Sequence, residues 1–330
     1  MKVSVLVPIC NVEQFLEKCL QSIISQTLED IEIICINDGS KDNSLAIIRK
    51  YADIDSRIVV IDKPNSGYGD SMNKGLSIAQ GEYIGIVESD DFVEREMFED
   101  LYKLAKKHNA DVVKSNYNLY WESPEKYEFY NSLNVNGIEI VTDVCREKLF
   151  WGSPAIWSAI YKRNWLLNNN IRFLTTPGAS YQDTSFKFKT ASLAQNIVLT
   201  SKAYLNYRQD NVNSSVKAAS KEKVLVLHKE YEEIKRFIEE NDCLKYGKYY
   251  FTQMLFGYLW NYKRCENTFR NEYFNIMCNS IRKEGMKYNL VNDKLPKFLR
   301  FGGYYSIINN NRVLFDLMLF LSKIKGNFLK

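Results

Sequence analysis

The first third of the chain alternates short apolar runs with amphipathic stretches. The run VSVLVPI (3–9) is rich in β-branched residues, as is typical of a strand buried on both faces of a parallel sheet. The stretch 12–26 then repeats apolar side chains at helical spacing, and Asn11 is a candidate cap for this helix. The pattern continues with strands expected at 31–37, 57–63 and 82–88 and helices expected at 44–52, 69–80 and 95–108. The sequence therefore predicts an α/β fold in which helices cover both faces of a mostly parallel sheet.

The length of 330 residues argues for one large domain and an accessory region. From about residue 216 the strand pattern is lost, and KEKVLVLHKEYEEIKRFIEEN begins an aromatic-rich helical region. We therefore expect an α/β domain over 1–215 and a helical C-terminal region over 216–330.

The charge balance disfavours a polyanion partner, because 44 Lys and Arg face 40 Asp and Glu in an even spread. We expect no nucleic-acid partner. The seven cysteines form no CxxC pair, which indicates a reducing, cytoplasmic compartment. The N-terminus resembles a first core strand rather than a signal peptide. No stretch reaches the roughly 18 to 20 consecutive apolar residues that a membrane span needs, so any membrane contact is expected to be peripheral.

Polar and glycine residues follow each of the expected strands. These strand ends carry residues 8–11, 37–40, 65–69 and 88–91. Ligands of open parallel sheets bind beyond the carboxyl ends of the strands. Neither GxGxxG nor GxxxxGK[ST] follows the first strand, so a dinucleotide fingerprint and a phosphate loop are both excluded.

The segment VESDDF (87–92) places three carboxylates, Glu88, Asp90 and Asp91, within four positions. Such neighbours repel one another and raise one another's pKa values. Carboxylates suit Mg²⁺ or Mn²⁺, and Glu88 and Asp90 project to one face of an extended segment. The alternative is that the three carboxylates cap the helix expected at 95–108, whose positive end favours them.

Three stretches together carry a resemblance to a known family: residues 3–44, residues 65–91 and SYQDTSF at 180–186. In order and spacing they resemble the nucleotide-sugar glycosyltransferases of family 2, inverting enzymes with the GT-A fold. The resemblance implies a Rossmann-like domain with a nucleotide-sugar-binding half at 1–115 and an acceptor and base half at 116–215.

In that family the nucleotide lies at the first two strand ends. The resemblance implies that Pro8 and Asn11 line the base and ribose pocket, that Glu13 lies near it, and that Asp38 contacts the base edge. A carboxylate accepts the imide N–H of uracil, which favours a UDP-sugar. The family usually has Tyr where this chain has Cys10, and Tyr68 is a candidate to replace its stacking. Read without the family, the alternative for Asp38 is a turn residue of NDGS.

ESDD resembles the metal-binding DXD element of the family. The resemblance makes Asp90 and Glu88 the metal ligands, with Glu88 beside the ribose or a metal-bound water and Asp91 orienting the sugar. The cation, Mn²⁺ or Mg²⁺, stabilises the leaving diphosphate. The donor site is also expected to include Gly67, Tyr68, Asn73, Ser89 and Arg208. Alternatively, the glycine-rich segment is a flexible turn and Arg208 forms an exposed salt bridge.

SYQDTSF resembles the element whose Asp serves the family as general base, which nominates Asp183 as the catalytic residue. Gln182 replaces the usual Glu and removes a like charge beside Asp183. The alternative is that Asp183 caps a helix at 184–194. Trp151 and Trp157, with Gln182, are candidate contacts to an acceptor sugar, although helically spaced tryptophans more often pack in a core.

The sequence thus predicts metal-assisted, inverting transfer of a sugar, from a UDP-sugar, to a hydroxyl of a glycan or lipid-linked saccharide in surface polysaccharide synthesis. The alternatives are a nucleotidyltransferase, disfavoured by the absence of a basic glycine-rich N-terminal loop, and a non-catalytic sugar-nucleotide-binding module, disfavoured by Asp183. The C-terminal stretch RVLFDLMLFLSKIKGNFLK is apolar and ends in lysines. It is expected to lie on the inner face of the membrane or to pack within the protein or a homodimer.

Overall fold

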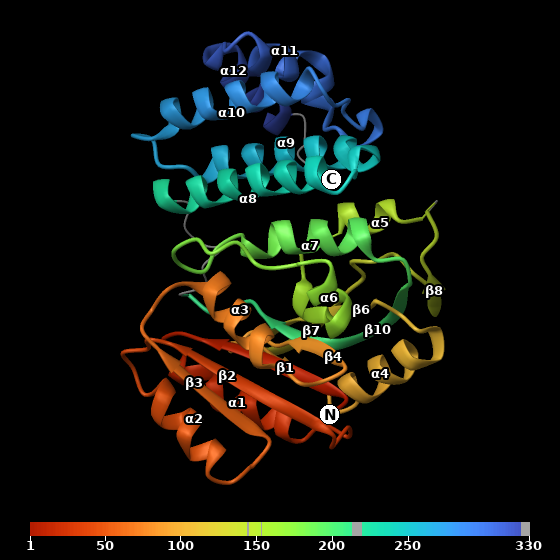
Figure 1. Ribbon diagram of the computed structural model, residues 1–330. Helices are drawn as coiled ribbons and strands as arrows, with labels where there is room; N and C mark the ends of the chain where they lie inside the picture. The colour runs from red at the N-terminus through yellow and green to blue at the C-terminus, as the bar shows by residue number, and fades with distance from the viewer. Residues whose placement is uncertain (144, 153, 213–219, 325–330) are drawn as a thin grey trace. The chain divides into compact units, whose positions relative to one another are not determined.

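The computed structural model describes residues 1–143, 145–152, 154–212 and 220–324 (Figure 1). The chain divides into two compact units, Met1–Ser215 and Val216–Lys330. Each unit has its own buried core, and each is described by itself.

The first unit is built on a ten-stranded sheet with the order β3-β2-β1-β4-β9-β6-β10-β5, to which β7 adds beside β6 and β8 beside β10. Its strands are β1 (Val3–Ile9), β2 (Ile31–Asp38), β3 (Ile58–Lys63), β4 (Tyr83–Ile86), β5 (Phe92–Val93), β6 (Val112–Glu122), β7 (Glu125–Tyr130), β8 (Ile138–Ile140), β9 (Ala159–Lys162) and β10 (Ile197–Arg208). Strands β1 to β4 are parallel to one another, β9 runs antiparallel to both β4 and β6, and β10 is parallel to β6. The predicted α/β class is confirmed, and the antiparallel β9 joins the two parallel groups.

Helices cover both faces of the parallel strands, with α1 and α2 on one face and α3 on the other (Figure 1). The helices of this unit are α1 (Glu13–Ile24), α2 (Ser44–Ala52), α3 (Tyr68–Ile78), α4 (Met97–His108), α5 (Glu147–Trp151), α6 (Arg163–Asn168) and α7 (Gln182–Leu193), with a short 3₁₀ turn η1 (Ile156–Ser158). Every residue of β1 and β2 is buried, as their continuous apolar runs predict.

The expected caps differ from the observed ones. Asn11 does not cap α1: it has a left-handed φ of 52°, and its side-chain oxygen accepts from the backbone N–H of Lys41 at 2.8 Å. The first turn of α1 is instead satisfied from outside, because Asp42 accepts the backbone N–H of Glu13 at 2.9 Å. Helix α4 begins at Met97 with no side-chain cap, so the acidic triplet does not cap it.

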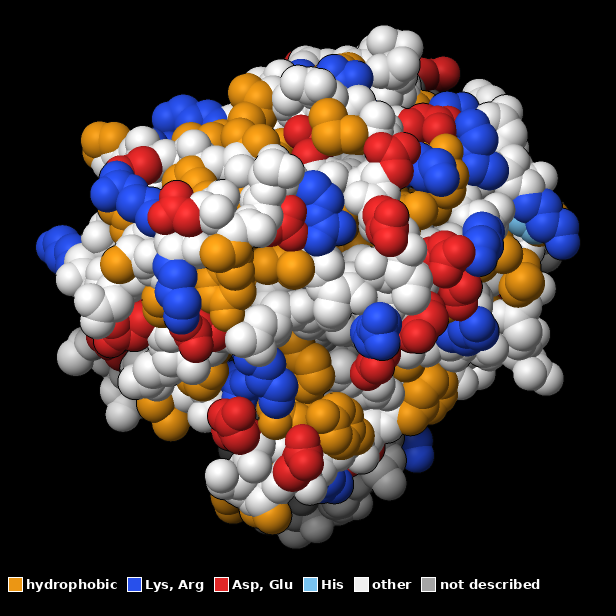
Figure 2. Space-filling model, turned by 90° about the horizontal axis from the view of Figure 1, so that it is seen from below, with side chains coloured by type: hydrophobic (Ala, Val, Ile, Leu, Met, Phe, Trp, Pro, Cys, Tyr) orange, Lys and Arg blue, Asp and Glu red, His pale blue; other side chains and the backbone are white. Residues whose placement is uncertain are grey.

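On the face of the molecule in Figure 2, basic and acidic side chains are interspersed and hydrophobic side chains form small groups between them. This is the distribution of an ordinary solvated surface.

The second unit is helical over its described residues, 220–324. Its helices are α8 (Lys221–Glu240), α9 (Gly247–Arg264), α10 (Arg270–Gly285), α11 (Tyr304–Ile308) and α12 (Arg312–Ile324), with short turns at η2 (Leu244–Tyr246), η3 (Asn292–Lys294) and η4 (Leu299–Gly303). Large buried aromatic residues, among them Tyr250, Tyr258 and Tyr273, fill its core. Among the described residues, no helix combines the length and the apolar character needed to cross a membrane.

Candidate active site

The ends of β1 and β2 form the first part of the site. Cys10 and Asn11 are exposed there, and the Asn65 side chain donates to the backbone oxygen of Asp38 at 2.9 Å. Pro8 is buried inside β1, where it lies opposite Ile36. Behind this group, Glu13 accepts the backbone N–H of Asn43 at 2.8 Å and so fastens the start of α2 to α1.

Asp38 is held by the protein on both oxygens. It is 5% exposed and forms a buried ion pair with Lys63. Its two oxygens also accept the backbone N–H groups of Ser66 at 2.8 Å and Gly67 at 3.0 Å. Asp38 therefore fixes the glycine-rich segment in place, and these contacts set the orientation of its carboxylate. Its contact with the edge of a nucleotide base remains a prediction.

The glycines of this segment make room for the protein's own backbone. Gly67 has a φ of 95°, and a Cβ built on it would lie 2.6 Å from the backbone oxygen of Thr176. A Cβ on Gly69 would overlap the backbone oxygen of Leu174. Between them, the backbone N–H of Tyr68 donates to the oxygen of Gly178 at 2.9 Å. The close approach that the sequence assigned to the donor is that of the 173–178 segment.

Asn73, expected at the donor, also holds this segment. Its side-chain oxygen accepts the backbone N–H of Phe173 at 3.0 Å, and its NH₂ donates to the oxygen of the same residue at 2.9 Å. Both polar ends of the amide are used to fasten the 173–178 segment to α3, and a donor contact of Asn73 remains a prediction.

Gly69→Ala is expected to destabilise the first unit by about 1–3 kcal/mol, because the added methyl group overlaps the Leu174 carbonyl and overpacks this contact. Thermal unfolding of the variant checks this prediction. Gly152→Ala is the matched control, since a Cβ there meets neighbours at an ordinary 3.4 Å. Equal melting temperatures for both variants would contradict the packing described.

The acidic triplet lies on a turn after β4, closed by the backbone N–H of Asp91 donating to the oxygen of Glu88 at 3.0 Å. Glu88 accepts the Tyr68 hydroxyl at 2.7 Å, and Asp90 accepts the Asn211 side chain at 2.8 Å. Asp91 is 1% exposed, and its Oδ1 accepts the backbone N–H of Arg208 at 2.8 Å. Its Oδ2 is buried without a hydrogen-bond partner among the described residues. Ser89, which lies between Glu88 and Asp90 in the sequence, is also buried.

Two carboxylates of the turn, Glu88 and Asp91, have raised pKa values. Burial raises the pKa of Glu88 to about 8, with further contributions from the charges of Asp90 and Asp183. Burial, followed by the charge of Asp90, also raises the pKa of Asp91 well above its ordinary value. Within the described part of the chain, no three metal-binding side chains form a ready cluster. The raised pKa values and the orphaned Asp91 Oδ2 fit a divalent cation that takes its remaining ligands from substrate phosphates, as Mg²⁺ commonly does.

Arg208, expected at a diphosphate or in an exposed salt bridge, is 4% exposed. Its guanidinium is buried over the ring of Phe15, at 4.4 Å from the ring centroid. It donates to the backbone oxygen of Asp90 at 3.0 Å and to Glu122 at 2.9 Å. Together with the backbone bond to Asp91, these contacts make Arg208 the residue that holds the acidic turn from β10.

Asp183 lies in the first turn of α7 and is half-buried. The helix has no side-chain cap, so the capping alternative is not observed. Burial raises the pKa of Asp183 to about 6, and the charge of Lys187 opposes the rise. The charges of Glu88 and Asp183 both act on the Tyr68 hydroxyl. The turn after β4 and the start of α7 thus bring their carboxylates to the same place.

Gln182, expected at the acceptor, is 2% exposed and shapes the backbone before α7. Its side-chain oxygen accepts the backbone N–H of Ser180 at 2.6 Å, and its NH₂ donates to Thr176 at 2.9 Å. Gln182 therefore supports this loop, and its contact with an acceptor remains a prediction.

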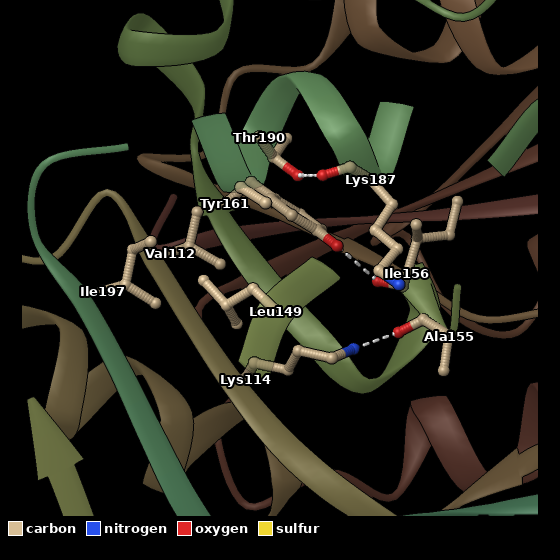
Figure 3. A pocket seen from close by; sticks show the side chains of 10 residues that line it. Val112, Lys114, Leu149, Ala155, Ile156, Tyr161, Lys187, Thr190 and Ile197 are labelled. Carbon is tan, nitrogen blue, oxygen red and sulfur yellow. Dashed lines mark hydrogen bonds between the residues drawn. The ribbon is translucent and has the colours of Figure 1, made fainter. Parts of the chain in front are cut away.

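Two half-buried lysines hold backbone groups at the end of α5 and around η1, and Figure 3 shows both. Lys187 donates to the backbone oxygens of Phe150, at 3.1 Å, and Gly152, and Lys114 donates to Ala155 and to the Ser158 hydroxyl. Burial lowers the pKa of Lys114 to about 7 and that of Lys187 to about 8. Since Lys187 lies one turn after Asp183, it ties the helix that carries the candidate base to the end of α5.

The two tryptophans differ in their surroundings. Trp157 is 8% exposed and stacks on Tyr207, with ring centroids 5.2 Å apart. Trp151 is half-buried at the end of α5. Sequence reasoning missed Tyr207. The signal available was its position next to Arg208, because neighbouring residues of a strand point to opposite faces of the sheet.

Comparison with known proteins shows which family the chain resembles. A model of the family described as glycosyl transferase family 2 matches residues 4–178, a range that includes the acidic turn and ends before Asp183. The chain is 33% identical over 207 residues to glycosyltransferase GlyA of Streptococcus pneumoniae serotype 4, which covers 62% of this chain and 28% of GlyA. It is 31% identical over 273 residues to the cholesterol galactosyltransferase of Borreliella burgdorferi, which covers 77% of this chain and 74% of that protein. The chain thus spans less than a third of the length of GlyA.

The fold is similar to that of S. aureus TarS 1–349 in its crystal structure with UDP-GlcNAc. The TM-score is 0.75 at 20% identity, and the alignment covers 100% of this chain and 93% of that one. The predicted GT-A fold is confirmed by this likeness and by the family match.

Proposed function

The chain belongs to glycosyl transferase family 2, and we propose that it transfers a sugar from a UDP-sugar to a hydroxyl of a glycan or lipid-linked saccharide, with inversion. One observation carries the proposal: Glu88, on the turn after β4, accepts the Tyr68 hydroxyl, and the charge of Asp183, at the start of α7, acts on the same hydroxyl. Glu88 accepts that hydroxyl, and Asp183 lies near enough for its charge to raise the pKa of Glu88.

The carboxylates divide the chemistry between them. Asp183 takes the proton of the acceptor hydroxyl while the oxygen of that hydroxyl attacks the anomeric carbon. The bond from that carbon to the donor phosphate breaks on the opposite face, and the nucleoside diphosphate leaves with the electron pair. A single displacement of this kind inverts the anomeric centre. A pKa of about 6 leaves Asp183 mostly ionised at neutral pH and still basic enough to accept a proton.

A divalent cation, Mn²⁺ or Mg²⁺, would be held by Asp90 and Glu88, with Asp91 Oδ2 as a further oxygen ligand. Its contribution when bound is to stabilise the negative charge of the leaving diphosphate. The nucleotide would lie at the ends of β1 and β2, beside Asn11 and Asp38. The complex of the similar TarS fold with UDP-GlcNAc supports a UDP-linked donor here.

The test is release of nucleoside diphosphate from a panel of UDP-, GDP- and TDP-sugars, with Mn²⁺ and with chelator. Release from a UDP-sugar that the chelator abolishes is the expected result. Release of pyrophosphate would instead indicate a nucleotidyltransferase. Metal-dependent UDP binding without release in the presence of a saccharide acceptor pool would favour the binding-module alternative.

The enzyme is proposed to work in the cytoplasm at the inner face of the membrane. All seven cysteines are free, which suits a reducing compartment. Helix α12 leaves Val313, Leu317, Phe320 and Leu321 exposed at helical spacing. Such a stripe, in a sequence stretch that ends in lysines, suits an anionic lipid surface.

Replacing Leu317 and Phe320 together by Glu is expected to abolish co-sedimentation with vesicles that contain anionic lipid, because the charges oppose insertion of the stripe. Ile54→Glu, a change at an exposed apolar residue of the first unit, is the control and should sediment like the parent. A parent protein that ignores vesicles, and forms dimers that the double variant loses, would assign the stripe to a homodimer instead.

A further inference from the structure

Four aromatic side chains from separate elements form a cluster in the first unit: Tyr117 of β6, Tyr130 of β7, Trp157 of η1 and Tyr207 of β10. Trp157 stacks on Tyr207 at 5.2 Å and 29°. Tyr117 meets Trp157 edge-on at 4.6 Å and lies 5.0 Å from the ring of Tyr130. We call this group the aromatic platform.

The platform has a buried side and an open side. Trp157 and Tyr117 are 8% and 4% exposed, whereas Tyr207 is half-buried and Tyr130 is 44% exposed. A cluster that served only the core would be buried throughout, as Tyr250, Tyr258 and Tyr273 of the second unit are. The two inner rings therefore support the two outer ones, of which Tyr130 is exposed and Tyr207 is partly exposed.

The backbone that carries Tyr207 adjoins the acidic turn, because the N–H of the next residue, Arg208, donates to Asp91. Tyr207 precedes Arg208, which holds the turn through the backbone groups and carboxylate of Asp90 and Asp91. The charges of Asp91, Asp90 and Glu88 all reach the Tyr207 hydroxyl and, after burial, raise its pKa. That hydroxyl has no hydrogen-bond partner among the residues that the structure describes.

A sugar ring matches these features. One face of a pyranose carries C–H groups that pack on the electron-rich face of an aromatic ring, and its edge carries hydroxyls that bond to a phenol. We propose that the aromatic platform binds a sugar ring of the acceptor, with Tyr207 and Tyr130 in contact with it. The inference rests on the proposed function and moves the acceptor contact from the tryptophans expected from the sequence to these two tyrosines.

Methyl β-glycosides of glucose, galactose and N-acetylglucosamine are the probes, titrated at millimolar concentration and followed by saturation-transfer NMR in the presence of UDP and Mn²⁺. Saturable binding of at least one glycoside is expected. Tyr207→Ala should weaken it about tenfold, and Tyr130→Ala should weaken it less, in line with the energies of aromatic contacts. Tyr207→Phe keeps the ring and should retain most of the binding.

Tyr127→Ala is the matched control, because Tyr127 is a similarly exposed tyrosine of β7 whose ring packs on Tyr120 instead. Thermal unfolding and UDP binding verify that each variant is folded. The proposal is overturned if none of the glycosides binds the parent protein, or if Tyr207→Ala and Tyr130→Ala both bind like Tyr127→Ala. If the parent protein shows no metal-dependent UDP binding, that result counts against the proposed function alone, because the glycoside titration reports on the platform separately.

Discussion

Asp183→Asn is expected to lower the rate of sugar transfer by about 10²–10⁴-fold, the usual contribution of a general base. The amide keeps the shape of the side chain but cannot take a proton from the acceptor hydroxyl. Donor binding should persist, because the acidic turn and the ends of β1 and β2 are untouched. Initial rates with a saccharide acceptor, and calorimetry with UDP and Mn²⁺, measure the two properties separately.

A pH profile sharpens this prediction. With a pKa of about 6, Asp183 is active as a base when ionised, so kcat/KM of the parent should fall as the pH drops through about 6. The residual activity of the Asn variant should lack that limb. Asp53→Asn, a change at an exposed residue after α2, is the control and should reproduce the parent profile. Turnover that is unchanged in Asp183→Asn would remove the residue from the mechanism.

Asp90→Asn is expected to weaken metal-dependent binding of UDP by at least about 100-fold, since even groups that only orient metal ligands cost 10- to 100-fold when changed. The variant keeps a polar group opposite Asn211, so the turn itself should persist. Calorimetry with Mn²⁺ and with chelator measures the loss. The parent should lose affinity on chelation, whereas the variant should bind weakly under both conditions.

Glu125→Gln removes a carboxylate from an exposed position of β7 and serves as the control for charge alone. If Asp90→Asn still binds UDP in a metal-dependent manner, the cation is held elsewhere. Asp91→Asn would then be the next variant, because Asp91 carries the buried oxygen without a partner.

The parallel part of the fold was predictable because its strands are buried on both faces. VSVLVPI and IEIICIN read as continuous apolar runs, and β1 and β2 lie where these runs predict. The later strands carry no such signal. All residues of β7 are exposed, and β10 mixes buried and half-buried positions around irregular pairing with β6. Pairing partners far apart in the sequence decide these strands, and the local pattern does not contain them.

The site was predictable in its carboxylates and less so in its amides. Glu88, Asp90 and Asp91 stand together in the sequence, and a charged cluster after a buried strand needs a reason to exist. Asn73 and Gln182 were assigned to ligands, yet the structure uses both amides on backbone groups of 173–180. Whether a polar side chain faces a ligand or its own chain depends on where a distant loop runs, which the residue type alone does not reveal.

The buried guanidinium of Arg208 sets a limit on how the enzyme can be re-engineered. The family match ends at residue 178, and this end is an obvious point at which to join the chain to the later part of a relative. A chimera cut there would transplant the acidic turn without the strand end that clamps it, because Arg208 grips both Asp90 and Asp91 from β10. A chimera that keeps the acidic turn in place therefore has to include β10 together with residues 1–115. The exchangeable region is confined to the segments between β6 and β10 that do not contact Arg208.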